Sequence, residues 1–244
     1  MSKDIFSFST VTSTNDVTKI LLENRTNVIV NAKLQLKGRG RNNKKWIGDS
    51  EKNIFLSIGI EYKNIDEESS IKMLGYQCLG CLAVLQVLEK LDSSVKFCLK
   101  YPNDIYAKKK EDDFRKISGV LIENEFLGSK LKSTILGIGV NVYQNKFEEN
   151  INATSLVLLG INIGIDVLNM QIISEIEQLK SMQLKELIEE WKLILNLEAK
   201  VVELVGREGK WKTIGFDDYG MLKVKQGNEM KTICNGDSIR YDLN

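Results

Sequence analysis

Residues 37–46 read Lys-Gly-Arg-Gly-Arg-Asn-Asn-Lys-Lys-Trp, a basic stretch that is punctuated by glycine and ends in an aromatic ring. Between Asn24 and Gly48 the chain has seven basic residues and no acidic one. The whole chain has 34 basic and 33 acidic residues, which leaves 27 basic against 33 acidic residues outside this window, a net charge of −6. Positive charge concentrated in this way predicts a site for an anionic ligand. The two glycines allow backbone N–H groups to approach that ligand closely.

The composition is that of an ordinary globular protein except for one missing residue type. The 244 residues are 43% hydrophobic and 27% charged, which suits one large domain or a medium domain with a small one. The chain contains no histidine. This excludes Ser-His-Asp and Cys-His catalysis and the usual zinc enzyme motifs. Any chemistry must use lysine, arginine, carboxylate, amide or backbone groups.

Nothing in the sequence predicts secretion or membrane insertion. No apolar run approaches about 18 residues, so no membrane span is expected, and the N-terminus opens without a signal or transit segment. The single CxxC lies inside a helical pattern, so the cysteines are expected to be reduced and to serve as buried small hydrophobes. They are Cys78, Cys81, Cys98 and Cys234. These features predict a cytoplasmic protein.

Apolar periodicity predicts a sheet with packed helices over the first 196 residues. Strands are expected at residues 5–9, 28–32, 53–62, 95–100, 105–106, 116–123 and 133–142. Helices are expected after residue 16, at residues 68–91 and at residues 167–195, the last with a break near Ser181.

The composition changes after about Asn196 to short alternating strands separated by tight turns. These strands are expected at residues 201–205, 211–216, 221–225, 230–234 and 238–241. Five such strands predict a small closed or partly open barrel of the SH3-like or OB kind. The predicted fold class is therefore α+β, with a mixed-sheet domain at residues 1–196 and a small barrel at residues 197–244.

Three further motifs carry polar or glycine residues at defined places. Thr12–Asp16 precedes a helical pattern, and its spacing favours simple helix capping over the binding of a polar ligand. Lys100–Asp104 is a turn that contains the only proline of the chain. Gly137 and Gly139 lie inside a strand and do not form a dinucleotide fingerprint. They predict that a flat ligand or a facing helix packs against the backbone, and both interpretations stay open.

In their order and spacing these elements resemble the biotin protein ligases, also called holocarboxylase synthetases. The elements are Ser13–Asn15, Gly38–Arg41 with Trp46, Lys100–Asp104, Lys116–Glu123 and Gly137–Val142. The resemblance covers essentially the whole chain and implies the class II synthetase-like biotin/lipoate ligase fold with a C-terminal SH3-like barrel. It implies a monofunctional ligase, because no helix-turn-helix precedes Ile5, and DNA binding is not expected.

The resemblance implies a two-step ligation that uses ATP. The carboxylate of biotin attacks the α-phosphate of Mg·ATP and gives biotinyl-5′-AMP and pyrophosphate. A lysine of the biotin carboxyl carrier domain of acetyl-CoA carboxylase, or of another biotin-dependent carboxylase, then attacks the mixed anhydride and releases AMP. Mg²⁺ is expected to arrive with ATP rather than in a dedicated protein site. Such chemistry depends on positioning and charge neutralisation, which fits a chain without histidine.

The resemblance also implies roles for individual residues. Those implied to bind biotin are Ser13, Thr14, Asn15, Gln35, Gly38, Arg39, Lys116, Gly119, Gly137 and Gly139. Those implied to bind ATP or the adenylate are Arg39, Gly40, Arg41, Trp46, Asn103, Lys116, Asn141 and Thr154. The implied catalytic residues are Lys116, Arg39, Arg41 and Asp104. Lys116 is expected to stabilise charge on the transferred oxygens, and Asp104 to orient the site or the incoming lysine.

Two features of this chain modify those expectations. Tyr101 stands where the family usually has tryptophan, which predicts altered packing around biotin. The six basic residues between Lys33 and Lys45 are expected to repel one another when no anion is bound. The basic loop is therefore expected to become ordered on binding.

Two other functions remain as alternatives. A lipoate or octanoate ligase would share the superfamily fold, although its arginine–glycine pattern differs. A nucleic-acid-binding protein would use the basic loop and the barrel, but a net charge of only +1 does not favour a broad basic face. Pairing of two copies through an exposed sheet edge is a further expectation.

Overall fold

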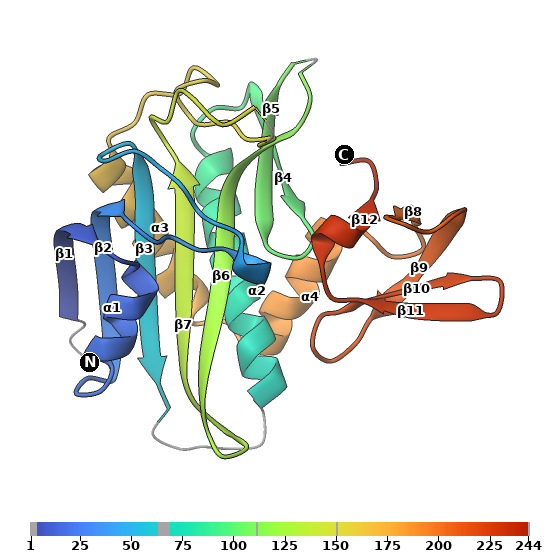
Figure 1. Ribbon diagram of the computed structural model, residues 1–244, viewed down its shortest axis with the longest axis horizontal. Helices are drawn as coiled ribbons and strands as arrows, with labels where there is room; N and C mark the ends of the chain where they lie inside the picture. Colours follow the sequence, from blue (N-terminus) through green and yellow to red (C-terminus); the bar gives the residue numbers. More distant parts are fainter. Residues whose placement is uncertain (1–3, 63–68, 111, 150, 244) are drawn as a thin grey trace.

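The computed structural model describes residues 4–62, 69–110, 112–149 and 151–243, which form a large sheet covered by helices and a smaller C-terminal sheet (Figure 1). The first three residues, on which the expectation about the chain's start depends, lie outside the described residues. The predicted helix start at Glu68 also lies outside them.

A seven-stranded mixed sheet forms the larger part of the structure. Its strand order is β1-β2-β3-β7-β6-β5-β4, and β1 runs parallel to β2 while the other neighbours are antiparallel. The strands are β1 (Asp4–Val11), β2 (Asn27–Gln35), β3 (Asn53–Glu61), β4 (Val95–Lys100), β5 (Asp104–Lys109), β6 (Arg115–Leu127) and β7 (Lys130–Asn141). The predicted mixed sheet with packed helices is confirmed. β3 is buried at every position except its last, because helices cover both faces of the sheet.

Four helices divide between the two faces of this sheet. They are α1 (Thr14–Leu21), α2 (Ser69–Glu89), α3 (Ile165–Leu179) and α4 (Leu184–Leu195). α1 lies on one face, and the other three lie on the opposite face (Figure 1). The predicted break near Ser181 is confirmed. There the Glu186 carboxylate accepts a hydrogen bond from the Gln183 N–H at the start of α4, and a left-handed Asn196 ends the helix.

One described helix is long and apolar enough to cross a membrane. Residues 70–89 form a 20-residue window with a mean hydropathy of 1.5, so the expectation that no apolar run approaches this length was wrong. In the fold 67% of that window is buried, and α2 packs on β6, β7, α3 and α4. Its apolar surface on all sides is therefore explained by its position as the central core helix.

A five-stranded antiparallel sheet follows α4, with the order β11-β10-β9-β8-β12. Its strands are β8 (Val201–Leu204), β9 (Lys210–Phe216), β10 (Leu222–Gln226), β11 (Glu229–Ile233) and β12 (Ile239–Arg240). These are the five short strands that the turn pattern predicts. Val202, Trp211 and Leu222 belong to the same buried cluster as side chains of α2 and α4. One continuous core therefore joins the two sheets.

Tyr101, in the turn after β4, connects that turn to the C-terminal sheet. Its hydroxyl donates to the Ile233 carbonyl at 2.7 Å and accepts from the Leu222 N–H at 3.1 Å. Its ring packs at an angle against Trp191 and Phe216, and the residue is only 3% exposed. The effect of Tyr101 on packing around biotin stays a prediction, and the contacts of the ring are with the C-terminal sheet and α4.

The four cysteines are free thiols in two different environments. Cys78 and Cys81 are fully buried in α2, as predicted. Cys98 is half-buried and Cys234 is exposed, so the prediction of buried small hydrophobes was wrong for these two.

Candidate functional site

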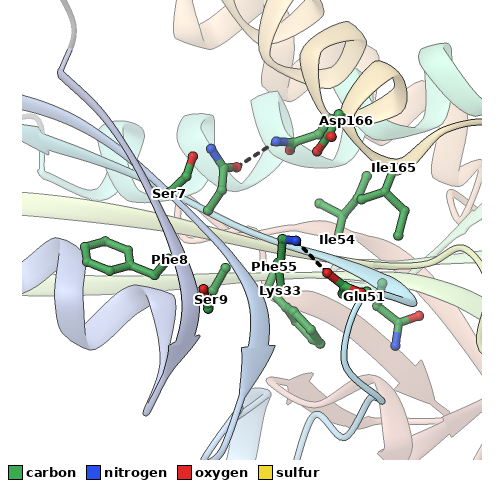
Figure 2. A pocket seen from close by; sticks show the side chains of 13 residues that line it. Ser7, Phe8, Ser9, Lys33, Glu51, Ile54, Phe55, Ile165 and Asp166 are labelled. Atoms are coloured by element: carbon green, nitrogen blue, oxygen red, sulfur yellow. Dashed lines mark hydrogen bonds and ion pairs between the residues drawn. The ribbon is translucent and has the colours of Figure 1, made fainter.

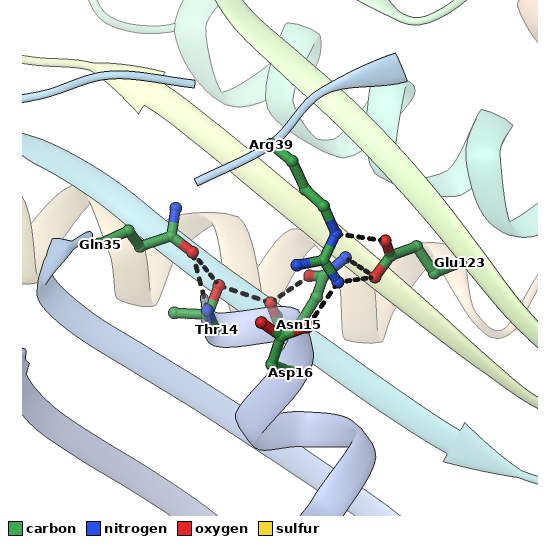
Figure 3. Close-up of polar contacts among 7 residues, drawn as sticks. Thr14, Asn15, Asp16, Gln35, Arg39 and Glu123 are labelled. Atoms are coloured by element: carbon green, nitrogen blue, oxygen red, sulfur yellow. Dashed lines mark hydrogen bonds and ion pairs between the residues drawn. The ribbon is translucent and has the colours of Figure 1, made fainter. Parts of the chain in front are cut away.

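The start of α1 forms a buried polar cluster with the end of β2 (Figure 3). The backbone N–H and the hydroxyl of Thr14 both donate to Gln35 Oε1, at 2.7 and 3.1 Å. Ser57 Oγ of β3 lies 2.7 Å from Thr14 Oγ1 and 2.6 Å from Asn15 Oδ1. Thr14 and Asn15 are 3% and 4% exposed. A buried network with its hydrogen bonds satisfied holds its members in fixed directions, so these side chains act as one unit.

Ser13 precedes α1 as its N-cap residue, but its side chain makes no capping hydrogen bond. The Thr14 hydroxyl is engaged by Gln35 rather than by the helix backbone. The sequence-based preference for simple capping was therefore wrong for these two hydroxyls. The alternative, in which this helix start serves a polar ligand, stays a prediction.

Arg39 joins this cluster to β6 through Glu123 (Figure 3). Its Nε and Nη2 donate to the two carboxylate oxygens at 2.6 and 2.7 Å, and Nη2 also lies 2.7 Å from Asp16 Oδ1. Asn15 Nδ2 donates to Glu123 at 2.8 Å. The hydrogen bond to Glu123 is the main cause that raises the pKa of Arg39, so the guanidinium keeps its charge. Within the described part of the chain, Arg39 Nη1 has no hydrogen-bond partner and remains available to an anion.

The basic loop (residues 37–46) folds back on itself as a short two-stranded bridge. The Trp46 N–H donates to the Gly38 carbonyl at 3.0 Å. A Cβ on Gly38 would overlap the Trp46 carbonyl, so only glycine lets the two sides of the loop approach this closely. Gly40 differs, because the nearest atom to a Cβ there is the Lys44 carbonyl oxygen at 3.7 Å.

The indole of Trp46 lies against the backbone of β7 at Gly139, where a Cβ would overlap the ring. Two residues earlier, a Cβ on Gly137 would lie 2.5 Å from Asn15 Oδ1. The sequence leaves a flat ligand and a facing helix equally open at these glycines. The structure shows α1 at Gly137 and a flat side chain of the protein itself at Gly139. Trp46 Nε1 is buried and has no hydrogen-bond partner among the described residues.

Lys116 lies between Asp104 and the Trp46 ring. Its Nζ is 2.7 Å from Asp104 Oδ1 and 5.3 Å from the centroid of the ring. Gly119 adjoins both charged groups, since a Cβ there would lie 3.2 Å from Asp104 Oδ1 and from Lys116 Nζ. The side chains of Lys116 and Asp104 are 29% and 23% exposed, so a ligand can still reach the pair. The structure thus brings together four of the predicted site residues.

Asn103, Asn141 and Thr154 are all buried. The side-chain amides of the two asparagines donate hydrogen bonds to backbone carbonyls. Asn103 Nδ2 donates to the Val120 carbonyl, and Asn141 Nδ2 donates to the Thr154 carbonyl at 3.0 Å. The Thr154 N–H donates to the Lys116 carbonyl at 2.8 Å. Asn103 and Thr154 therefore bond to β6, the strand that carries Lys116, and Asn141 bonds to Thr154.

Arg41 and Lys44 contact the C-terminal sheet rather than the Arg39 cluster. Arg41 Nη2 donates to the Cys234 carbonyl at 2.7 Å, and Nη1 lies 3.4 Å from the side-chain oxygen of Gln77. Lys44 pairs with Asp237. The structure therefore separates Arg41 from Arg39, although the sequence groups them in one motif.

Cations of the basic window pair with groups of the protein itself. Lys33 Nζ lies 2.5 Å from Glu51 Oε1, Arg39 pairs with Glu123, and Lys44 pairs with Asp237. The premise that these cations repel one another without an anion was wrong, because it overlooked carboxylates from distant segments. Ordering of the loop on binding stays a prediction.

A separate cavity of about 330 Å³ lies between β1, β2, β3 and α3 (Figure 2). None of the predicted site residues lines it. Asn169 Nδ2 donates to Asn31 Oδ1 at 2.7 Å, and the pair of Lys33 and Glu51 lies at its rim. Asn169 Oδ1 is buried without a hydrogen-bond partner among the described residues, but the cavity is separate from the residues that form the candidate site.

Three partners in the Arg39 cluster have no predicted role, although the sequence carries signals for two of them. Glu123 lies four residues after Gly119 in a strand, and the period of two places both on one face. Asp16 directly follows the Ser13–Asn15 motif. Ser57 lies in an almost wholly apolar strand, and no local pattern indicates its position beside Thr14.

The sequence region that holds this site matches a known protein family. The profile of the biotin/lipoate A/B protein ligase family matches residues 7–141, more than half of the chain. The chain belongs to this family. The matched region of this chain runs from β1 to the end of β7. It includes the basic loop, the Arg39 cluster and the Lys116–Asp104 pair.

Two curated proteins illustrate the similarity within the family. Bifunctional ligase/repressor BirA of Salmonella typhimurium is 25% identical over 215 residues, which cover 84% of this chain and 64% of that protein. The biotin–[acetyl-CoA-carboxylase] ligase of Mycobacterium tuberculosis is 31% identical over 137 residues, which cover 55% of this chain and 46% of that protein. The chain therefore spans less than two thirds of the length of these curated relatives.

Solved structures of family members extend the similarity to the C-terminal sheet. The biotin protein ligase from Aquifex aeolicus in complex with biotin and ATP superposes with a TM-score of 0.70 at 26% identity, covering 98% of this chain and 99% of that chain. The Leishmania major biotin protein ligase with biotinyl-5-AMP superposes with a TM-score of 0.61 at 22% identity, which shows the shared fold.

Proposed function

We propose that this protein is an ATP-dependent biotin protein ligase, which activates biotin as biotinyl-5′-AMP and transfers it to a lysine of an acceptor protein. One observation carries the proposal. Strand β6 carries both Glu123, which holds Arg39 and Asn15, and Lys116, which pairs with Asp104 beside the Trp46 ring. Similarity to a ligase solved with both biotin and ATP supports it.

The polar cluster at the start of α1 suits the neutral ring system of biotin. Ser13, Thr14, Asn15 and Gln35 offer hydroxyl and amide groups that both donate and accept, as a ureido group requires. Arg39 Nη1 suits a carboxylate. Gly139 gives a flat ring access to the backbone of β7 once the Trp46 indole moves, and Gly137 gives Asn15 of α1 close access to the same strand.

Lys116 is assigned to charge stabilisation in the first step. The biotin carboxylate forms a bond to the α-phosphorus of ATP, the bond to the bridging oxygen of pyrophosphate breaks, and the ammonium group stabilises negative charge on the transferred oxygens. Asp104, 2.7 Å away, holds the ammonium group in a defined direction. Among the described residues no group of three or more carboxylates and thiols could hold a metal ion. We assign Mg²⁺ to the nucleotide, where it would neutralise phosphate charge.

Asp104 also suits the second step. The acceptor lysine attacks the carbonyl carbon of the mixed anhydride, the bond to the AMP phosphate oxygen breaks, and the amine loses a proton. The Asp104 carboxylate is partly exposed beside Lys116 and would orient the incoming amine. The acceptor is assigned as the biotin carboxyl carrier domain of a biotin-dependent carboxylase.

The remaining loop residues are assigned to the nucleotide. Gly38 would present its backbone amide to phosphate, and Gly40, whose own N–H donates to the Lys44 carbonyl at 2.6 Å, would leave room for the ligand. Arg41 would retain the adenylate, and Trp46 would pack on adenine. Gly119 keeps space beside Lys116 for the same ligand. Asn103, Asn141 and Thr154 support this side of the site through their hydrogen bonds.

The domain assignment rests on the two sheets. Residues 1–196 would form the ligase domain and residues 197–244 an SH3-like barrel, which the strand number and the short turns support. Because one core joins the sheets, the two parts would act together. A cytoplasmic location and pairing of two copies through the edge strand β1 or β4 complete the proposal.

A lipoate or octanoate ligase is the nearest competing function, since the matched family includes lipoate ligases. The curated relative that matches at 31% identity is a biotin ligase, which favours biotin. A nucleic-acid-binding function is weakened by the ion pairs that the basic loop makes within the protein.

Biotin-dependent exchange of pyrophosphate into ATP tests the proposal, with lipoate and octanoate as matched substrates. We expect exchange with biotin only, followed by streptavidin-detectable labelling of a carrier domain. Exchange with lipoate but not with biotin would transfer the assignment to the competing ligase. Binding of nucleic acid that weakens steeply with salt, without any exchange, would favour the third function.

A further inference from the structure

The turn between β11 and β12 contacts the basic loop through two groups. The Cys234 carbonyl accepts a hydrogen bond from Arg41 at 2.7 Å, and the Asp237 carboxylate pairs with Lys44. Both contacts span 193 residues of sequence. They join the turn between β11 and β12 to the basic loop of the candidate site.

This turn is fixed to the rest of the protein. The Asp237 N–H donates to Asn235 Oδ1 at 3.1 Å, and Arg240 Nη1 donates to the Asp237 carbonyl at 2.9 Å. Gly236 is buried so closely against Tyr101 that a Cβ would overlap the Tyr101 carbonyl. Tyr101 belongs to the turn that leads into Asp104, so the Asp237 carboxylate has a defined place relative to the candidate catalytic pair.

Asp237 also lies in the electrostatic field of three lysines, which are Lys44, Lys100 and Lys116. Burial alone would raise the pKa of its carboxyl, but the hydrogen bond and charge of Lys44 outweigh this and hold the pKa below its usual value. Lys100 and Lys116 act in the same direction. The carboxylate is therefore charged at neutral pH. It points toward Lys44 of the basic loop.

We propose that Asp237 is a positioning residue for the basic loop. By holding Lys44 it keeps Arg41 at the Cys234 carbonyl and the Trp46 ring beside Lys116. The C-terminal sheet therefore sets the position of the loop across the site. The consequence for catalysis rests on the proposed ligase function, whereas docking of the loop does not.

Amide hydrogen exchange of peptides covering residues 37–46 in the ligand-free full chain tests the docking. We expect Asp237→Asn and Lys44→Gln each to speed exchange in this loop roughly two- to fivefold, the range of an exposed ion pair. The double variant should exchange no faster than either single variant, and Asp237→Glu should restore slow exchange. Asp218→Asn, an exposed carboxylate of the same sheet, is the control. Exchange at the wild-type rate in Asp237→Asn, or additive effects in the double variant, would overturn the proposal.

Pyrophosphate exchange with biotin tests the catalytic consequence. Asp237→Asn should raise the KM for ATP roughly threefold or more while kcat stays within about twofold, because the loop is displaced but Lys116 and Asp104 are intact. Faster amide hydrogen exchange in the loop together with an unchanged KM for ATP would refute the positioning role. A wild-type chain without biotin-dependent activity would refute the ligase assignment instead, and the hydrogen-exchange result would stand by itself.

Discussion

Arg39 and Glu123 are 84 residues apart in the chain, and their side chains meet in two hydrogen bonds of 2.6 and 2.7 Å. A substrate carboxylate that approaches Arg39 therefore meets a guanidinium whose Nε and Nη2 are already engaged. It must bind Nη1 or displace Glu123. Glu123 thus holds the plane of the guanidinium and limits which of its N–H groups can bind an anion.

Glu123→Gln should weaken biotin binding with little loss of fold. The amide keeps the shape of the side chain but loses the charge-assisted hydrogen bonds that direct Arg39 and Asn15. We expect the KM for biotin to rise roughly three- to tenfold, and the free energy of unfolding to fall by about 1 kcal/mol, since the pair is about one-third exposed. Initial rates and urea unfolding measure the two effects. Glu125→Gln, whose partner Lys132 is 3.8 Å away, is the matched control; an equal rise in KM there would contradict the prediction.

Lys116→Ala should impair adenylate formation far more than folding. The variant removes a charge that lies 2.7 Å from Asp104 at the candidate site. We expect the pyrophosphate exchange rate to fall roughly 100- to 1000-fold, as for loss of one preorganised charge-stabilising group, while unfolding changes by about 1 kcal/mol or less. Lys192→Ala, which removes a surface pair with Glu189, controls for general effects of lost charge. Parallel losses of activity and stability would count against the assigned role.

The two glycines of the basic loop should respond differently to alanine. A Cβ on Gly38 would overlap the Trp46 carbonyl, whereas a Cβ on Gly40 has its nearest neighbour at 3.7 Å. Gly38→Ala should therefore open the loop and speed its cleavage by trypsin, and Gly40→Ala should leave cleavage unchanged without ligand. If Gly40 meets phosphate, Gly40→Ala should still raise the KM for ATP. Similar cleavage of the two variants would show that the loop does not close in solution as described.

Arg41→Gly should let the reactive adenylate escape. The change removes the Arg41 contacts with Cys234 and Gln77, which hold the loop against the β11–β12 turn and α2. We expect more biotin on bystander lysines of an unrelated protein, detected by streptavidin blotting, because the mixed anhydride leaves before transfer. Arg25→Gly removes a surface pair with Asp4 and should not change this labelling. Unchanged labelling in Arg41→Gly would mean that other residues retain the adenylate.

Tyr101→Phe should change how stability depends on alkaline pH. Burial raises the folded-state pKa of Tyr101 from 10.0 to about 12, so the stability due to its neutral phenol is fully present below pH 10. That stability is lost as the pH rises through about 12, by about 2 to 3 kcal/mol. Phenylalanine cannot ionise, so the advantage of the wild type over Tyr101→Phe should shrink by that amount across the interval. Urea unfolding over this range measures it, and Tyr219→Phe, at a position that is 59% exposed, should show no such change.

The helices and strands were predictable because they depend on periodic burial. The alternation that predicts β6 and the break that separates α3 from α4 are local patterns, and both are present. The sequence also allowed a prediction that Lys116, Asp104 and Gly119 lie together. Lys116 and Gly119 share a motif, and Asp104 follows the adjacent turn. The SH3-like form of the C-terminal sheet remains a prediction.

The direction of the loop side chains was not predictable from local sequence. Arg39 and Arg41 are two residues apart, yet one meets Glu123 and the other meets Cys234. Which acceptor each finds depends on how distant segments dock, and the spacing of residues in the motif contains no information about that. The same reason explains why repulsion within the loop was overestimated.

The position of Trp46 gives the protein a built-in optical probe. Trp191 and Trp211 are 0% and 1% exposed and lie in the core, where they contribute a steady emission background. Trp46 is half-buried against Gly139, with the Lys116 ammonium 5.3 Å from its ring. A substrate that displaces this indole or neutralises that ammonium changes the fluorescence of one tryptophan out of three. Ligand binding can therefore be titrated on the unlabelled chain before any turnover takes place.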